Sequence, residues 1–128
     1  MIYLDASVAL AHLLVEDRLP APALWDEPLT ASRLLQYELW TRVHARRLER
    51  SHGDDVRALL ERVTLVELTP LVLARALEPF PVPVRTLDAL HLATVEFLRS
   101  HGQPIELASY DDRLLAGGRA LGVPIRAV

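Results

Sequence analysis

Short apolar runs alternate with longer amphipathic segments along this chain. Four runs are apolar or β-branched and have the length of buried strands, at residues 1–5, 29–32, 63–68 and 105–109. Between and after them, apolar side chains recur at helical spacing at residues 6–15, 33–50, 54–62, 69–77, from 86 onward and at 113–120. Ser51-His52-Gly53 is expected to end the helix over 33–50, and residues 124–128 are expected to form a final edge strand.

This alternation of strands and helices predicts the fold class. It is typical of an α/β protein built as a three-layer α/β/α sandwich on a mainly parallel sheet. A chain of 128 residues is long enough for one full hydrophobic core. We therefore expect a single domain over residues 1–128.

The helix that begins near Thr86 follows a rigid segment, residues 78–83, in which three prolines disfavour helix. Thr86 is the expected N-cap. The expected buried stripe is Leu87, Leu90, Thr94, Phe97 and Leu98. His91 lies on or beside that stripe, and we interpret it as a core histidine whose hydrogen bonds are satisfied.

Composition excludes several classes of function. The chain has no cysteine, which excludes disulfides, thiol catalysis and thiolate metal sites and suits a reducing cytoplasm. The N-terminus does not have the pattern of a signal peptide, and no apolar run is long enough to span a membrane. The net charge of −3 gives no global argument for nucleic-acid binding, although all 14 basic residues are arginine.

Acidic residues from distant parts of the sequence are expected at one edge of the sheet. Asp5 ends the first strand and Asp111 follows the fourth, and parallel strands place such residues at the carboxyl edge. Asp88 begins the long helix, and Glu38 lies near the start of the helix after the second strand. Clustered carboxylates repel one another, and a hard divalent cation compensates this charge with the oxygen ligands it prefers. The pattern favours metal-dependent phosphodiester hydrolysis.

The same residues carry a family resemblance that spans the chain. Tyr3-Leu4-Asp5-Ala6-Ser7, Tyr37-Glu38-Leu39, Leu87-Asp88-Ala89-Leu90-His91-Leu92-Ala93 and Ser109-Tyr110-Asp111 resemble, in order and at the usual distances, the signature of PIN-domain ribonucleases. In particular they resemble VapC-type toxins of bacterial toxin–antitoxin pairs. Each motif alone is weak, but the four together are specific.

The resemblance implies a role for each matched position. The metal-binding carboxylates of the family correspond to Asp5, Glu38, Asp88 and Asp111. Ser7 and Ser109 correspond to hydroxyls that bond the acids or the substrate. Asp112 is either a further acid of the site or a solvent-facing residue at a helix start. The resemblance also implies Mg²⁺ or Mn²⁺, RNA cleavage that gives a 5′-phosphate and a 3′-hydroxyl, a homodimer and a cognate antitoxin.

Two other enzyme classes fit less well. An aspartyl phosphatase needs a second Asp two residues after Asp5, where this chain has Ser7. A receiver domain relies on a lysine after a late strand, and this chain has none. The alternative from another class is a PIN-like binding module that keeps the fold and the partner but has lost cleavage.

Overall fold

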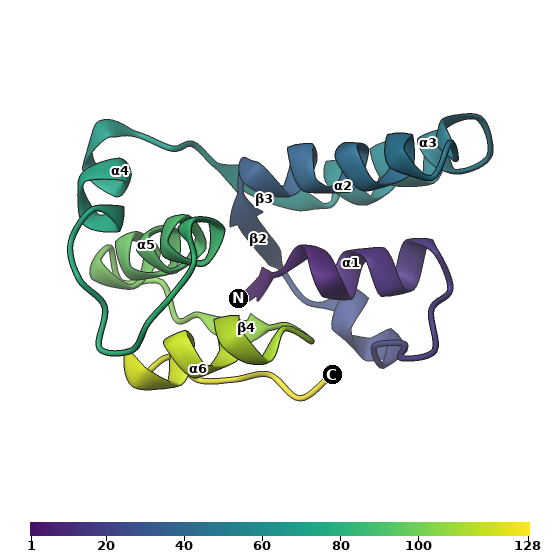
Figure 1. Cartoon of the computed structure of the whole chain (residues 1–128). Coiled ribbons are helices and arrows are strands. Elements are labelled where there is room, and N and C mark those ends of the chain that lie inside the picture. Colours follow the sequence, from purple (N-terminus) through teal and green to yellow (C-terminus); the bar gives the residue numbers. More distant parts are fainter.

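The computed structural model describes all 128 residues (Figure 1). The strands are β1 (Ile2–Leu4), β2 (Leu29–Ser32), β3 (Val63–Val66) and β4 (Glu106–Ala108). The helices are α1 (Ala6–Leu13), α2 (Leu34–Ala45), α3 (Glu49–Glu61), α4 (Pro70–Ala76), α5 (Thr86–Ser100) and α6 (Asp112–Ala120), and a short 3-10 helix spans Pro22–Asp26. No helix combines the length and the apolar character that crossing a membrane requires.

The four strands form one parallel sheet in the order β3-β2-β1-β4. The expectation of an α/β fold on a parallel sheet is confirmed. β1 lies between β2 and β4, so the residue that follows β1 is at the middle of the carboxyl edge. Ser32, at the end of β2, and Ser109, after β4, lie on either side of it. This order places Asp5 at the centre of the edge where open α/β folds build their sites.

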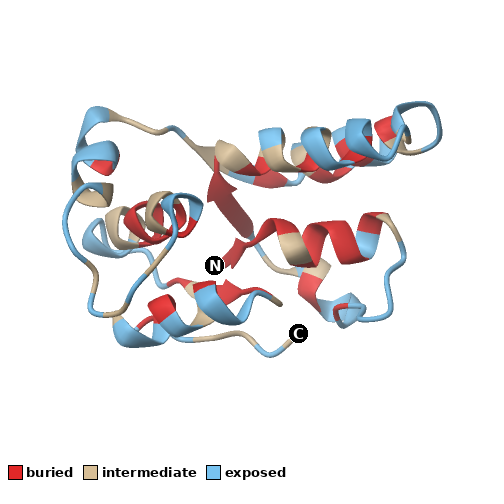
Figure 2. Cartoon of the chain, viewed as in Figure 1, coloured by how far each residue is buried: buried red, intermediate tan, exposed pale blue.

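Alternating side chains of β1 supply both faces of the sheet. Ile2 and Leu4 join the larger hydrophobic cluster, which includes side chains of α1, α2 and α3. Tyr3 points to the other face and joins the smaller cluster with side chains of α5 and α6, including Leu92 and Leu114. Figure 2 shows buried residues on the strands and on the helix faces turned toward them. The three-layer arrangement predicted from the sequence is therefore present.

The boundary between α2 and α3 differs from the prediction. Ser51-His52-Gly53 does not end a helix but lies inside α3, and the break comes earlier, between Ala45 and Glu49. Arg47 takes a left-handed conformation with φ of 55°, and Leu48 N donates to Val43 O at 2.9 Å. This is the Schellman arrangement that ends many helices, formed here around an arginine in place of the usual glycine. The sequence therefore carried no glycine signal at the true boundary.

The start and the buried face of α5 also differ from the prediction. Arg85 is the N-cap and Thr86 is the first helical residue, one position from the expected boundary. The buried face consists of Asp88 and His91–Val95. Leu87 is instead 48% exposed. Apolar periodicity misplaced the stripe because polar side chains, Asp88 and His91, occupy part of the buried face.

The C-terminal segment pairs with the sheet over a single bridge. Ile125 lies opposite Leu107 in parallel register. Leu107 N donates to Pro124 O, and Arg126 N donates to Leu107 O, both at 2.8 Å. The expected strand over 124–128 is thus reduced to one ladder step beyond β4.

The close contact between α6 and α5 gives a first prediction. A Cβ at Gly117 would lie 2.6 Å from Leu92 Cδ1, and Leu92 is fully buried and cannot move aside freely. We expect Gly117→Ala to lower the free energy of unfolding by up to about 2 kcal/mol, measured by urea denaturation. Overpacking costs about 1–3 kcal/mol, and the better helix propensity of Ala offsets about 0.5–1 kcal/mol of it. Gly53→Ala is the matched control, because the nearest atoms to its Cβ lie at 3.4 and 3.6 Å. That change should stabilise α3 by about 0.5–1 kcal/mol. Equal effects of the two substitutions would contradict the tight α5–α6 contact.

Candidate active site

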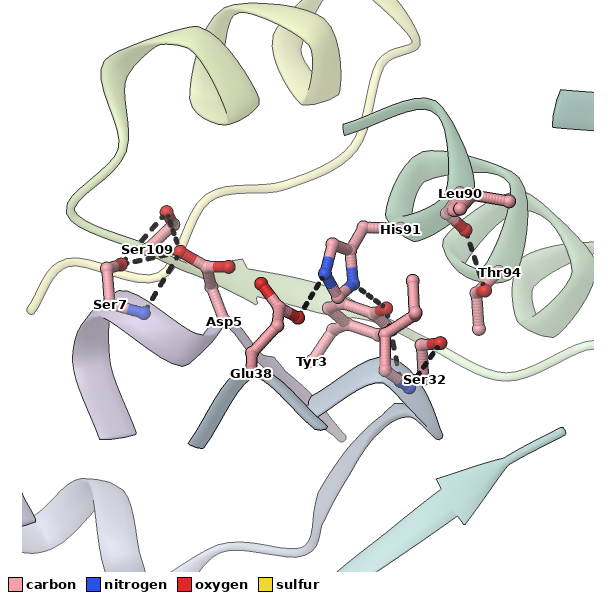
Figure 3. Close-up of polar contacts among 10 residues, drawn as sticks. Tyr3, Asp5, Ser7, Ser32, Glu38, Leu90, His91, Thr94 and Ser109 are labelled. Atoms are coloured by element: carbon pink, nitrogen blue, oxygen red, sulfur yellow. Dashed lines mark hydrogen bonds and ion pairs between the residues drawn. The ribbon is translucent and has the colours of Figure 1, made fainter. Parts of the chain in front are cut away.

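Asp5 is held at the carboxyl end of β1 by two serines. Ser7 Oγ donates to Asp5 Oδ2 at 2.5 Å, and Ser109 Oγ donates to the same oxygen at 2.8 Å (Figure 3). Ser7 N also approaches this oxygen, so Asp5 serves as the N-cap of α1. The residue is only 6% exposed. Asp5 is therefore a nearly buried acid with one oxygen fixed by hydroxyl donors, and both serines bond it as the resemblance implied.

The same serines position the loop that carries Asp111. Tyr110 N donates to Ser7 Oγ, and Asp111 N donates to Ser109 Oγ, both at 2.9 Å. Asp111 is exposed and caps α6, since its Oδ1 accepts from Arg113 N at 2.9 Å. Asp112, the first residue of α6, is exposed and makes no side-chain hydrogen bond or ion pair. Its placement matches the helix-start interpretation, in which it complements the helix dipole.

A chain of buried hydrogen bonds connects Glu38 to the sheet. His91 Nε2 lies 2.7 Å from Glu38 Oε1, and His91 Nδ1 lies 2.8 Å from the Tyr3 hydroxyl (Figure 3). That hydroxyl accepts from Ser32 N at 3.1 Å. In the neutral imidazole, Tyr3 then donates to Nδ1, which leaves Nε2 as the donor to Glu38. The interpretation of His91 as a satisfied core histidine is confirmed, and its partner is one of the candidate acids.

The charges around His91 change its proton affinity. Burial by itself lowers the pKa of His91, but the hydrogen bond to Glu38 and the negative charges of Glu38, Asp5 and Asp88 outweigh it, so that the pKa is raised. Burial also raises the pKa of Tyr3, which keeps the hydroxyl protonated and able to donate. The negative field of the acids therefore reaches the buried imidazole that holds Glu38.

Asp88 lies in the first turn of α5, close enough for its charge to act on His91. It is 8% exposed, and its Oδ2 accepts from Arg85 N at 3.2 Å, which caps α5. It does not line the groove described next. The helix-dipole role considered for Asp88 is therefore present, and its part in a metal site remains a prediction.

A groove of about 1090 Å³ opens at this edge of the sheet. Asp5, Glu38 and Asp111 line it, as does Ser7. Its walls come from α1, from the segment after α1, from one face of α2, from Leu87 and from Tyr110. The structure thus brings together three of the four predicted acids at one solvent-filled groove.

The donor atoms of the acids fit a hard cation, although they do not yet surround one point. Each acid uses one oxygen within the protein, namely Asp5 Oδ2, Glu38 Oε1, Asp88 Oδ2 and Asp111 Oδ1. The second oxygen of each accepts no hydrogen bond from the protein. Mg²⁺ and Mn²⁺ prefer such carboxylate oxygens. However, no three His, Asp or Glu side chains converge closely enough to hold an ion.

Sequence reasoning did not identify Tyr3 and Ser32 as parts of the site. Both are fully buried, and Tyr3 lies in a short apolar run whose pattern indicates only a buried strand. One signal was available: a buried tyrosine hydroxyl needs a hydrogen-bond partner. Which residue provides it could not be read from spacing, because Tyr3 and His91 are 88 residues apart.

Comparison with known proteins identifies relatives of this chain by family, sequence and fold. The profile of the PIN domain family matches residues 2–118. The chain is 33% identical to "Ribonuclease VapC47" of Mycobacterium tuberculosis, covering 95% of this chain and 93% of that protein. It is 30% identical to "Ribonuclease VapC35" of the same organism, covering 99% and 96%. A solved "Toxin-antitoxin complex from Klebsiella pneumoniae" contains a chain with the same fold, with a TM-score of 0.69, 17% identity and 94% coverage of both chains.

The buried hydrogen-bond chain gives a second prediction. Tyr3→Phe would leave Ser32 N and His91 Nδ1 without their shared partner. Because unsatisfied buried polar groups are costly, we expect the free energy of unfolding to fall by about 1–3 kcal/mol. Tyr37→Phe is the control, since Tyr37 is 64% exposed and should change stability by less than about 0.5 kcal/mol. Denaturant unfolding of both variants measures the difference. Equal stability of the two variants would contradict the buried hydrogen bonds of Tyr3.

Proposed function

This chain belongs to the PIN domain family, and from that premise we propose that it is a VapC-type ribonuclease, the toxin of a toxin–antitoxin pair. The observation that carries the proposal is that Asp5, Glu38 and Asp111, from three separate elements, line one groove at the carboxyl edge of the sheet. The relatives named as ribonucleases support it, because they match nearly the whole chain.

The proposed reaction is hydrolysis of an RNA phosphodiester that leaves a 5′-phosphate and a 3′-hydroxyl. Asp5, Glu38, Asp88 and Asp111 would hold Mg²⁺ or Mn²⁺ through the oxygens that the protein leaves unbonded. Such an ion, when bound, activates a water molecule and offsets charge on the phosphodiester.

The remaining residues of the site orient these acids. Ser7 and Ser109 fix one oxygen of Asp5, and His91 fixes one oxygen of Glu38. Asp5 and Glu38 are therefore each presented to the groove in one orientation, the role that hydrogen-bond partners of metal ligands play.

The proposal includes a protein partner and a second copy of the chain. An antitoxin would lie across the groove and offer an arginine to the carboxylates, a strong charge-assisted pairing. The relationship to a chain from a toxin–antitoxin complex supports this partner. For the homodimer, we propose the surface of α4, the proline segment and the start of α5. This surface exposes Leu71, Leu73, Leu77 and Leu87 beside a groove of about 720 Å³.

The third prediction separates an enzyme from a binding module. Glu38→Gln keeps the shape of the side chain and removes its charge. Mutation of a residue that only hydrogen-bonds a metal ligand typically lowers activity by about 10–100-fold. Loss of the ligand itself should therefore slow single-turnover RNA cleavage by more than about 100-fold. Asp5→Asn should do the same, and the double variant should lose little more because both serve one site.

Asp112→Asn is the internal control for this assay. Its side chain makes no hydrogen bond or ion pair, so a much smaller loss is expected. Normal cleavage by Glu38→Gln would remove Glu38 from the site. Folded wild-type protein that leaves total cellular RNA intact in Mn²⁺ would favour the PIN-like binding module.

The fourth prediction concerns metal and stability. Mn²⁺ at one hundred times its dissociation constant should raise the free energy of unfolding by about 2.7 kcal/mol, because it binds only the folded chain. Asp111→Asn should weaken this response yet keep the fold, because Asn caps a helix about as well as Asp. Thermal melts with and without Mn²⁺ give the measurement, with Mg²⁺ as the second ion. Coincident wild-type melts would rule out the metal site.

A further inference from the structure

One face of α2 runs along the groove away from the acids. The groove-lining residues of this helix and its C-cap recur at spacings of three and four, as Leu34, Tyr37, Glu38, Thr41, Arg42, Ala45 and the C-cap Arg46. Arg42 and Arg46 therefore follow Glu38 by one and two helical turns on the same face. With a rise of 1.5 Å per residue, they lie about 6 and about 12 Å along the helix axis from Glu38. The acidic end of the face thus continues directly into a row of cations.

No acid neutralises Arg42 and Arg46, in contrast to four other arginines of the chain. Arg33, Arg57, Arg75 and Arg126 form ion pairs with acidic side chains. Arg42 and Arg46 are exposed and have neither an ion pair nor a side-chain hydrogen bond. Arg18, on the opposite wall of the groove, makes only a cation–π contact, with its guanidinium 4.2 Å from the centre of the Tyr110 ring. The groove therefore keeps three guanidinium groups available to a ligand.

The electrostatics of the groove require such cations if its ligand is a polyanion. Five acids line it, adding Glu16 and Asp17 to the three candidate catalytic acids, against these three arginines. A phosphate strand that approached the acids alone would meet like charge at every step. Cations placed one and two turns from Glu38 attract the flanking phosphates while the central phosphate lies against the acids.

We propose that Arg42 and Arg46 form an arginine ladder that binds successive backbone phosphates of single-stranded RNA on one side of the bond to be cut. The inference rests on the ribonuclease function proposed above. Arg18 contacts the strand from the opposite wall, over Tyr110. Guanidinium groups suit this role because they donate two parallel hydrogen bonds to a phosphate. The ladder contacts only the phosphates. It therefore adds affinity and fixes the position of the RNA strand along the groove, but it gives no preference for particular bases.

The regular spacing favours a nucleic-acid strand over an acidic protein segment as the ligand. A phosphodiester backbone presents one charge per nucleotide at a repeating distance, whatever its sequence. Arg42 and Arg46 repeat along one helix face in the same way. Acidic side chains of a protein partner have no such fixed repeat, and the experiment includes that partner as a competing outcome.

The first arm of the test measures RNA binding without divalent metal, so that it does not depend on cleavage. A fluorescent single-stranded RNA of mixed sequence is titrated with wild type, Arg42→Gln, Arg46→Gln and the double variant over a range of KCl. Each lost contact should reduce the slope of log affinity against log salt by about 0.7, which weakens binding about fivefold near 0.1 M salt. Arg50→Gln is the matched control, because Arg50 is exposed, lies in α3 and does not line the groove.

The second arm locates the contacts. Single-turnover cleavage with Mn²⁺ is measured on RNA whose phosphates next to the cut are replaced, one at a time, by neutral methylphosphonate. A neutral phosphate opposite Arg42 should slow wild type and have no further effect on Arg42→Gln, as expected for two changes that remove one contact. The corresponding result is expected one nucleotide further along for Arg46→Gln.

The outcomes distinguish the ladder from the ribonuclease function. Changed salt slopes without any cleavage would support the ladder and contradict the enzyme. Cleavage with unchanged slopes and no methylphosphonate coupling would overturn the ladder and leave the enzyme. Binding of a poly-glutamate peptide that depends on Arg42 and Arg46 when RNA binding does not would also overturn it, in favour of an acidic protein partner.

Discussion

The Tyr3 hydroxyl adds side-chain hydrogen bonds that connect four elements, β1, β2, α5 and, through His91, α2. It accepts from the end of β2 at Ser32, lies on the central strand, and bonds His91 of α5, which in turn holds Glu38 of α2. A buried hydroxyl without partners is costly, so the geometry of this chain restrains all four elements together. The orientation of Glu38 at the groove is thereby tied to the packing of the sheet against α5, and substitutions in the smaller hydrophobic cluster can alter the site without touching it.

Asp5 and Glu38 are oriented by different physical means. Asp5 receives two hydroxyl donors and caps α1, so local hydrogen bonds at the sheet edge fix it. Glu38 is 23% exposed at its side chain, and a buried imidazole holds it from behind. In both cases one oxygen is bound by the protein and the other is left for solvent or a ligand. Ser7, Ser109 and His91 thus set which oxygen of each acid faces the groove, and this arrangement requires the whole fold.

The sequence predicts the parts of this molecule that depend on local pattern. Strand positions, the parallel sheet and the placement of Asp5 and Asp111 at one edge follow from apolar runs and from the geometry of α/β folds. The α2–α3 boundary could not be predicted, because Arg47 occupies the left-handed position where glycine is usual. The buried face of α5 was misplaced, because Asp88 and His91 are buried through partners far away in sequence. Polar contacts between residues far apart in sequence leave no periodic signal. The hydrogen bonds that connect Tyr3 through His91 to Glu38 are therefore visible only in the folded structure.

The distribution of charge within the groove matters more than the net charge of the chain. The net charge of −3 acts weakly at long range, because fields of exposed charges are largely screened beyond about 8 Å at physiological salt. Acids gathered at the sheet edge suit a cation, and unpaired arginines further along α2 suit phosphates. Because α2 and its C-cap carry Glu38, Arg42 and Arg46 on one face, the helix itself sets the distance between the two charge types. The hydrogen bond from His91 orients Glu38 at the acidic end of this face.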